Sequence, residues 1–249
     1  MIQFTDISKS FDGRMVLEDV SGTFKPGDTN LIIGGSGTGK SVLLKCLIGL
    51  VKPDQGNVLY NGRDFWNSDE DTRKQIRREM GVLFQGGALF DSKTVAQNVR
   101  FPLEMLTNMS ESEKEDRVNF CLSRVGLEQA AGRMPSEISG GMKKRVGIAR
   151  AIVMNPKYLF CDEPNSGLDP LTSIKIDELI KEITDEYHIT TVVITHDMNS
   201  VLEIGEKVMF LYKGHKVWEG NNTTITHSKV AELNEFIFAN KLLRDMSRQ

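Results

Sequence analysis

The pattern of apolar and polar positions changes along the chain from strict alternation to short continuous apolar runs. Residues 2–8 and 15–24 alternate and carry β-branched or aromatic side chains, which predicts two strands joined by a turn at Asp12 and Gly13. Later apolar runs predict strands that are buried in a sheet. These runs comprise residues 31–33, 80–84, 157–163 and 189–195, and a hairpin is predicted over residues 206–218.

Helical periodicity accounts for most of the remaining chain. It predicts helices over residues 42–50, 69–79, 94–106, 110–125 and 142–154, and another from Pro170. Ser110 and Glu113 have the spacing of a capping box. Residues 226–249 predict an amphipathic helix with Leu233 and Leu242 in its apolar stripe, which either packs on its own domain or docks on a partner. This mixture of strands and helices indicates an α/β protein.

A glycine-rich segment between the apolar run 31–33 and the helix 42–50 fits the pattern GxxxxGK[ST]. Its residues are Gly34, Gly35, Ser36, Gly37, Thr38, Gly39, Lys40 and Ser41. Glycines let several backbone N–H groups point into one anion site, and the next helix directs its positive end there. Lys40 would bind the β- and γ-phosphates of a nucleotide, and the Ser41 hydroxyl would ligate Mg²⁺. The alternative is a turn that binds nothing, which the spacing and the flanking elements disfavour.

Two strands end in residues with candidate catalytic chemistry. Asp162 and Glu163 end the run 157–163, and because neighbouring strand residues face opposite ways, the two carboxylates cannot have identical roles. One can hold Mg²⁺ while the other orients or deprotonates water. His196 closes the run 189–195, at the edge where such sheets bind ligands. The alternatives are a strand cap with two solvated acids and a structural histidine.

Four further features are candidates for contacts. Phe11, before the first turn, either packs at a strand end or offers its ring to adenine. Gln85 ends the run 80–84, and the loop at residues 86–90 is apolar enough to be an interface. Ser139, Gly140 and Gly141 begin a helix, and the N–H groups of its first turn make a second anion site.

Composition limits the class of protein. The chain has 249 residues, 39% apolar and 26% charged, which describes a soluble globular protein with one large domain or a domain and a subdomain. A net charge of −3 offers no global reason to bind nucleic acid. Cys46, Cys121 and Cys161 lie in apolar elements and suit the reducing cytosol. Without a signal peptide or a spanning run, any membrane association must come through a partner.

These motifs, in this order, resemble the ATPase subunits of ABC transporters. The matching segments are Phe11 (A-loop), residues 34–41 (Walker A), Gln85 (Q-loop), residues 139–141 (signature motif), residues 158–163 (Walker B), residues 166–169 (D-loop) and His196 (switch histidine). A narrower set looks like the ATPases of Mla-type phospholipid transporters: residues 84–91, 94–95, 98–99 and 101–103, and Met142 where most relatives have Gln. The resemblance implies a P-loop NTPase fold with a RecA-like core, an antiparallel β subdomain and a helical subdomain.

The resemblance also implies a role for each matching residue. The catalytic group comprises Glu163 as general base, His196 and Gln85; ATP meets Phe11, residues 34–41, residues 139–141 and Asp169; and Mg²⁺ meets Ser41, Gln85 and Asp162. Residues 139–141 should act on ATP held by a second copy of the chain, which implies a homodimer with two composite sites. Met142 cannot make the polar contact of an amide, so a nucleotide contact from that position is in doubt.

The implied organisation is an ABC ATPase domain at residues 1–225, a helical subdomain at about residues 86–155 and a C-terminal helical extension at residues 226–249. The implied partners are integral membrane permease subunits, a small accessory subunit and a lipid-carrier protein, with no nucleic acid. The subunit would lie on the cytoplasmic face of a bacterial inner membrane. An importer ATPase for an amino acid or a metal chelate shares every catalytic residue and is the main alternative; a soluble ABC protein is another.

Overall fold

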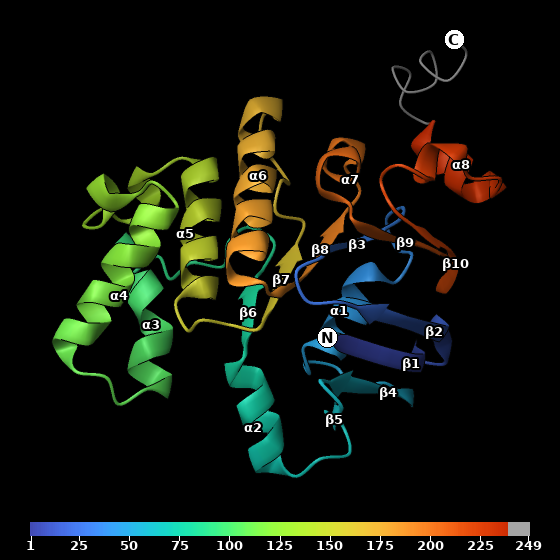
Figure 1. Cartoon of the computed structure of the whole chain (residues 1–249), viewed down its shortest axis with the longest axis horizontal. Helices are drawn as coiled ribbons and strands as arrows, with labels where there is room; N and C mark the ends of the chain where they lie inside the picture. The colour runs from blue at the N-terminus through green and yellow to red at the C-terminus, as the bar shows by residue number, and fades with distance from the viewer. Residues whose placement is uncertain (239–249) are drawn as a thin grey trace.

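The computed structural model describes residues 1–238 and arranges them on two β-sheets (Figure 1). The smaller sheet is antiparallel, with the order β2-β1-β4-β5. Its strands are β1 (Ile2–Phe11), β2 (Arg14–Phe24), β4 (Gln55–Tyr60) and β5 (Arg63–Asp64). Asp12 and Gly13 both have positive φ, at 48° and 75°, as a two-residue hairpin turn requires. The predicted pair of strands and its turn are confirmed.

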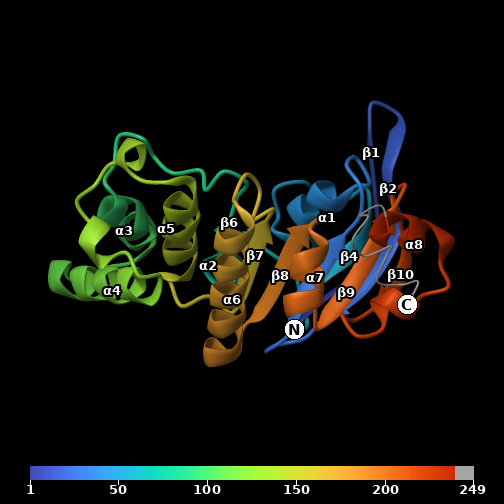
Figure 2. The same cartoon turned by 90° about the horizontal axis from the view of Figure 1, so that it is seen from above.

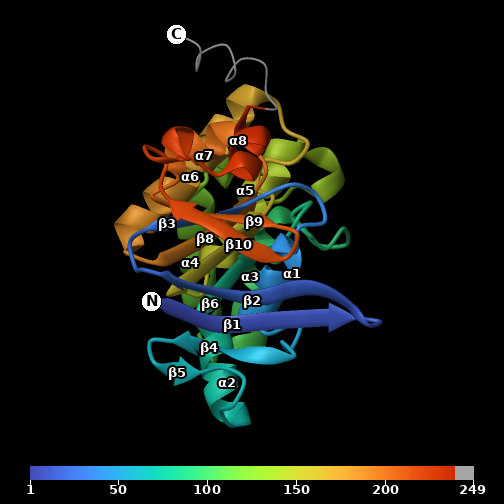
Figure 3. The same cartoon turned by 90° about the vertical axis from the view of Figure 1, so that its right-hand side faces the viewer.

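The larger sheet has six strands in the order β10-β9-β3-β8-β7-β6. They are β3 (Thr29–Ile33), β6 (Met80–Leu83), β7 (Tyr158–Asp162), β8 (Thr190–Thr195), β9 (Lys207–Tyr212) and β10 (His215–Gly220). All neighbours are parallel except β10, which turns back along β9 as an edge strand. Figure 3 shows this sheet and the smaller one as separate layers. The predicted apolar strands and the hairpin are therefore confirmed.

Helices cover both faces of the larger sheet. α1 (Lys40–Leu47) lies between the two sheets, where its apolar residues share one core with both of them. The other face is covered by α5 (Gly140–Ile152), α6 (Pro170–Tyr187) and α7 (Met198–Ile204), in a second core. The short helix α2 (Glu70–Arg78) leads into β6.

Burial raises the pKa of the free thiols of Cys46 and Cys121 to about 11.

A helical segment projects to one side of the sheets (Figures 1 and 2). It contains α3 (Val95–Leu106), α4 (Glu111–Arg124), the short turns Glu128–Ala130 and Pro135–Glu137, and the start of α5. At the start of α4 the Ser110 Oγ accepts from the Glu113 N–H, and a Glu113 carboxylate oxygen accepts from the Ser110 N–H, so the predicted capping box is confirmed. Within residues 1–238 no helix is long and apolar enough to cross a membrane.

The predicted continuous helix from residue 226 is wrong in its described part. The chain forms a short turn, Ile225–His227, and then α8 (Ala231–Ile237), with residues 228–230 outside any helix. Ser228 breaks the helix because its Oγ accepts from the Val230 N–H and its carbonyl accepts from the Asn234 side chain. Leu233 and Ile237 are buried in the core of the same chain, whereas Leu242 lies outside the described residues.

Candidate nucleotide-binding site

Four neighbouring parallel strands bring the predicted motifs to one edge of the larger sheet. β3 precedes the glycine-rich loop, β8 precedes His196, β7 ends at Asp162, and β6 ends two residues before Gln85. The pairing of Asp162 with Ile194 puts the ends of β7 and β8 at the same level. This carboxyl-end edge is where parallel α/β sheets bind ligands.

The loop between β3 and α1 needs its glycines. Gly34 has a φ of 149°, and a Cβ there would lie 2.3 Å from the Leu211 carbonyl oxygen. Gly39 has a φ of 100°, and a Cβ there would lie 2.9 Å from the Val16 carbonyl oxygen. The backbone can therefore pass close to β2 and β9 and curl back into the first turn of α1. The N–H groups of that turn then face the loop, as in an anion site.

The Lys40 side chain is held inside this loop. Its exposed fraction is 8%, and its Nζ donates to the carbonyl oxygens of Gly34 and Gly35 at 2.8 Å each. Burial lowers the pKa of Lys40, and the nearby Glu163 and Asp162 carboxylates oppose that shift. The ammonium group is thus partly desolvated and bonded to carbonyl groups that an anionic phosphate can replace.

Glu163 and His196 face each other across the ends of β7 and β8. The His196 Nδ1 lies 2.8 Å from Oε2 and 3.0 Å from Oε1 of Glu163. The glutamate side chain is 14% exposed and the imidazole 65%. Glu163 has a φ of 50°, which is uncommon outside glycine and is found at functional sites. The pair fits a base with an orienting partner.

Asp162 differs from its neighbour in the way the alternation predicted. Its Oδ1 is buried and has no hydrogen-bond partner among the described residues. Burial raises the pKa of Asp162, the adjacent Glu163 charge raises it further, and Lys45 and Lys40 oppose the shift. An unpaired carboxylate oxygen of this kind fits a hard cation that takes its other ligands from phosphate and water. The Ser41 side chain is exposed in the first turn of α1, and the Gln85 side chain is exposed two residues after the end of β6.

A cavity of about 530 Å³ opens at the phosphate loop. Its lining includes Gly35, Ser36, Glu163 and His196, which brings the loop and the acid–imidazole pair together. Phe236 and Ile237 of α8 also line it. The sequence alone does not indicate that the C-terminal segment lies at this site.

The predicted second anion site lies apart from the first. Ser139 caps α5, and its Oγ accepts from the Met142 N–H at 3.3 Å. Gly140 and Gly141 follow, and a Cβ on Gly141 would lie 2.6 Å from the Thr172 Cγ2, so α5 and α6 approach closely there. Residues 139–141 are not part of the described lining of the 530 Å³ cavity, and Figure 2 shows α5 and α1 well separated. Within one chain the two anion sites do not meet.

Phe11, at the end of β1, and Asp169, at the start of α6, are both exposed. The Phe11 side chain is 44% exposed, with the Lys9 Nζ 5.4 Å from its ring centroid, so the ring is not a buried packing residue. The Asp169 carboxylate caps α6 by accepting from the N–H and the hydroxyl of Thr172. These bonds lower the pKa of Asp169.

Two basic residues of α5 reach functional loops, and the sequence analysis missed both. The Lys144 Nζ, almost buried, donates to the Glu163 carbonyl oxygen at 3.1 Å and to the Ser166 Oγ at 3.2 Å. The Arg150 guanidinium donates to the carbonyl oxygens of Gly87 and Ala88. The signal in the sequence was weak because Lys144 stands between Lys143 and Arg145 and looks like part of a solvated basic run.

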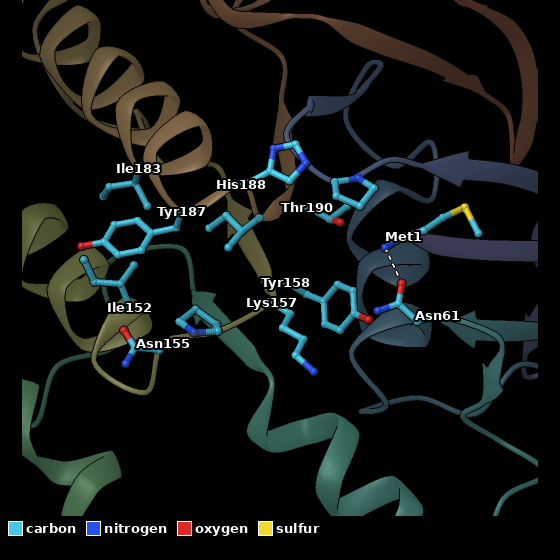
Figure 4. Close-up of a pocket in the computed structure, with 13 residues that line it drawn as sticks. Met1, Asn61, Ile152, Asn155, Lys157, Tyr158, Ile183, Tyr187, His188 and Thr190 are labelled. Carbon is cyan, nitrogen blue, oxygen red and sulfur yellow. Dashed lines mark hydrogen bonds between the residues drawn. The ribbon is translucent and has the colours of Figure 1, made fainter.

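A second cavity, of about 370 Å³, lies at the opposite edge of the same sheet (Figure 4). Ile183 and Tyr187 of α6 form one side of it, and Met1 and Asn61 form the other. It lies at the amino ends of β7 and β8, where α6 ends at His188 in a left-handed conformation. Because a helix C-terminus is the negative end of the dipole, this edge does not favour phosphate.

Fold and geometry together define a P-loop ATPase cassette, and comparison with known proteins gives its family. The sequence profile described as "ABC transporter" matches residues 17–166, more than half of the 249 residues. The chain belongs to this family and has the ABC ATPase fold.

Curated relatives and solved structures agree with this assignment. A probable ribonucleotide transport ATP-binding protein, mkl, of Mycobacterium bovis is 38% identical over 95% of this chain and 66% of the relative. A methionine import ATP-binding protein, MetN, of Caulobacter vibrioides is 42% identical over 88% of this chain and 67% of the relative. This chain therefore spans about two thirds of the length of these relatives.

Two solved cassettes resemble the fold closely. The first is the ATP-binding cassette MJ0796, a dimer in a post-hydrolysis state bound to ADP and Pi, with a TM-score of 0.81 and 33% identity over 89% of this chain and 99% of that one. The second is cbiO1 from Clostridium perfringens, part of the ABC transporter complex cbiONQ, with a TM-score of 0.85 and 29% identity over 98% of each chain.

Proposed function

We propose that this protein hydrolyses ATP to drive a membrane transporter, with Glu163 as the general base. The observation that carries the proposal is the Glu163–His196 pair, 2.8 Å apart, in the cavity that the phosphate loop also lines. Glu163 would accept a proton from the attacking water, and His196 would hold the carboxylate and face the γ-phosphate. Gln85, two residues after the end of the neighbouring strand β6, would help to place that water and the metal.

Binding of the nucleotide would rearrange the loop. Lys40 would exchange its two carbonyl partners for the β- and γ-phosphates, and the N–H groups of residues 34–41 would hold the remaining oxygens. Phe11 would stack on the adenine. Ser41, Gln85 and Asp162 would hold Mg²⁺, which neutralises phosphate charge when bound. The buried, unpartnered Oδ1 of Asp162 supports this assignment.

A second copy of the chain would complete each site. Residues 139–141 and Asp169 do not line the cavity of their own chain, and Ser139, Gly140 and Asp169 are exposed at helix starts. In a head-to-tail homodimer they would face the ATP held by the partner. ATP would then contribute binding energy that only the closed dimer collects, and hydrolysis would remove it. The solved relative that forms a dimer bound to ADP and Pi supports this arrangement.

A groove of about 310 Å³ near Gln85 is the proposed contact for the permease. Its lining includes Phe84, Phe90, Phe101 and Leu106, with the Phe90 and Phe101 ring centroids 4.7 Å apart. Arg150 of α5 donates to the carbonyl oxygens of Gly87 and Ala88, beside this groove. A movement of α5, the helix that begins at the signature motif, would therefore also move the groove. A helix of an integral membrane subunit suits such an apolar groove. The chain would thereby lie at the cytoplasmic face of the membrane.

Phospholipid is the proposed substrate of the transporter. The proposal rests on the resemblance of residues 84–91 and 94–103 to Mla-type ATPases, with a small accessory subunit and a lipid-carrier protein as further partners. Asn98 holds the loop before α3 in place. Its buried amide accepts from the Phe90 N–H and donates to three carbonyl groups of residues 90–94. The methionine import relatives support an amino-acid importer as the second candidate.

The test uses this chain with the membrane subunits that copurify with it, in proteoliposomes. We expect ATP-dependent movement of fluorescent phospholipid to acceptor vesicles, and Phe90→Asp should abolish it without changing nucleotide affinity. Leu50→Asp, at an exposed apolar residue outside the groove, is the matched control. ATP-dependent methionine uptake without lipid movement would establish the second candidate. Normal assembly, hydrolysis and transport in Phe90→Asp would refute the groove assignment.

A further inference from the structure

One buried carboxylate near the site has no part in the proposed chemistry. Asp177 lies on α6 and is 3% exposed. Its Oδ1 accepts from the Asn165 Nδ2 at 2.8 Å, and the same Nδ2 donates to the Ser200 Oγ at 3.0 Å. Burial raises the pKa of Asp177 to about 6, while bonds from Ser200 and Asn165 oppose the shift. A buried carboxylate lowers the stability of the fold, which suggests that its hydrogen bonds serve another purpose.

The Asp177 network joins three segments around the site. Asn165 lies two residues after Glu163, in the loop that runs to Asp169. Ser200 lies on α7, four residues after His196, and α7 packs beside α6 (Figure 1). Asp177 thus fixes the segment after the general base relative to the segment after the histidine.

The Asn165 side chain depends on this network for its position. Its Oδ1 is buried and has no hydrogen-bond partner among the described residues, so only Nδ2 is anchored. On the other side of the loop, Lys144 of α5 holds the Glu163 carbonyl and the Ser166 hydroxyl. The loop is therefore held between α5 on one side and α6 with α7 on the other.

We infer that Asp177 is a positioning residue for ATP hydrolysis: through Asn165 it fixes the loop after Glu163, and through Ser200 it fixes that loop relative to His196. The inference rests on the proposed function of Glu163. Asp177 does not line the cavity that contains Glu163 and His196, so it would act through the geometry of that pair. Because a displacement of about 1 Å in a reacting group can cost about a hundredfold in rate, loss of the anchor should lower kcat more than it raises KM.

The surroundings of Asp177 show which charges act on it. Asp197 and Glu203 raise its pKa from the α7 side, and the Cys161 thiol of β7 lies nearby. On its open side a cavity of about 280 Å³ is also lined by Glu178, Lys181 and Glu182. None of these groups, among the described residues, bonds to Asn165, which leaves Asp177 and Ser200 as the anchors of its amide.

The test compares variants of this chain by ATP hydrolysis. The kcat is expressed per nucleotide-binding site, and the number of sites comes from equilibrium binding of a fluorescent ATP analogue. Asp177→Leu removes the acceptor, and we expect kcat to fall about tenfold with KM changed less than about twofold. Asp177→Asn keeps an acceptor oxygen for Asn165, and its kcat should stay within about threefold of the original. Glu178→Gln, the same loss of charge at an exposed neighbour, should change neither. A kcat for Asp177→Leu within about twofold of the original would overturn the inference.

A second measurement shows the route of the effect. In the Glu163→Gln background, Asp177→Leu should cause no further loss beyond about twofold, because the group it positions is already gone. A further tenfold loss in that background would show an action independent of Glu163 and would refute the inference. If Glu163→Gln alone hydrolysed ATP normally, the proposed function would fail, and the kcat of Asp177→Leu in the original background would still decide whether Asp177 affects turnover.

Discussion

The two edges of the six-stranded sheet have similar cavities but opposite chemistry. At the carboxyl-end edge, a cavity of about 530 Å³ meets the start of α1 and contains Glu163 and His196. At the amino-end edge, a cavity of about 370 Å³ meets the end of α6 and is lined by side chains such as Ile183 and Ile189. The strands are the same, so their direction decides which edge can bind phosphate. The glycine-rich loop and the start of α1 follow the end of β3, so the positive end of a helix lies at the carboxyl-end edge.

The largest expected effect is at the carboxyl-end edge. Glu163→Gln keeps the shape of the side chain but removes the base, so we expect ATP to bind normally and hydrolysis to slow by about 10² or more. Phosphate release and equilibrium nucleotide binding would be measured on the same preparation. Near-normal turnover would remove Glu163 from this role.

A somewhat smaller effect is expected in the phosphate loop. Lys40→Ala removes the ammonium group that now bonds to Gly34 and Gly35 and would bond to phosphates. Loss of charged hydrogen bonds of this kind should weaken ATP binding by about a hundredfold. Titration with a fluorescent ATP analogue measures it. Lys45→Ala, at an exposed lysine of the same helix, is the control and should bind within about threefold of the original.

Much of this edge could be predicted from sequence because its signals are local. Spacing within residues 34–41 gives the loop, and apolar runs that end in Asp162 or His196 give the strands and their direction. A parallel sheet then brings the strand ends together. What each residue does there stays a prediction until variants are measured.

The missed features depend on contacts between distant residues. Lys144 bonds to Glu163, and Arg150 bonds to Gly87, which lies far from it in the sequence. The periodicity of apolar residues does not predict such contacts. The break before α8 was missed for a similar reason. Apolar spacing continues through residues 228–230, but the hydrogen bonds of Ser228 compete with the helix.

A pH experiment tests whether the carboxyl-end edge carries a stability cost. The pKa of Asp177 is about 6, above its ordinary value of 3.8, so between these values the folded state binds more protons than the unfolded state. Stability of the original chain should then fall by about 2 kcal/mol as pH rises from about 4.5 to about 6.5. Asp177→Asn lacks this titration. Urea unfolding across that pH range should show that the free energy of unfolding of the variant rises relative to that of the original chain. If the two free energies changed with pH in parallel, the account would be contradicted.

The smallest effect is expected at the amino-end edge. Thr190 is 1% exposed, and its Oγ1 has no partner among the described residues. Thr190→Val replaces an unsatisfied hydroxyl with a methyl group, so stability should rise by about 1 kcal/mol. The kcat and KM for ATP should not change. A loss of hydrolysis here would show that this edge takes part in function and would break the comparison.

The most direct test is the mass of the Glu163→Gln variant in solution, because the account holds that the carboxyl-end edge is half of a composite ATP site. Light scattering should show twice the 27.9 kDa mass of the chain with ATP and Mg²⁺, and a single chain with ADP. Adding Ser139→Arg should prevent the doubling without weakening ATP binding. An unchanged mass when ATP is bound would contradict the composite site.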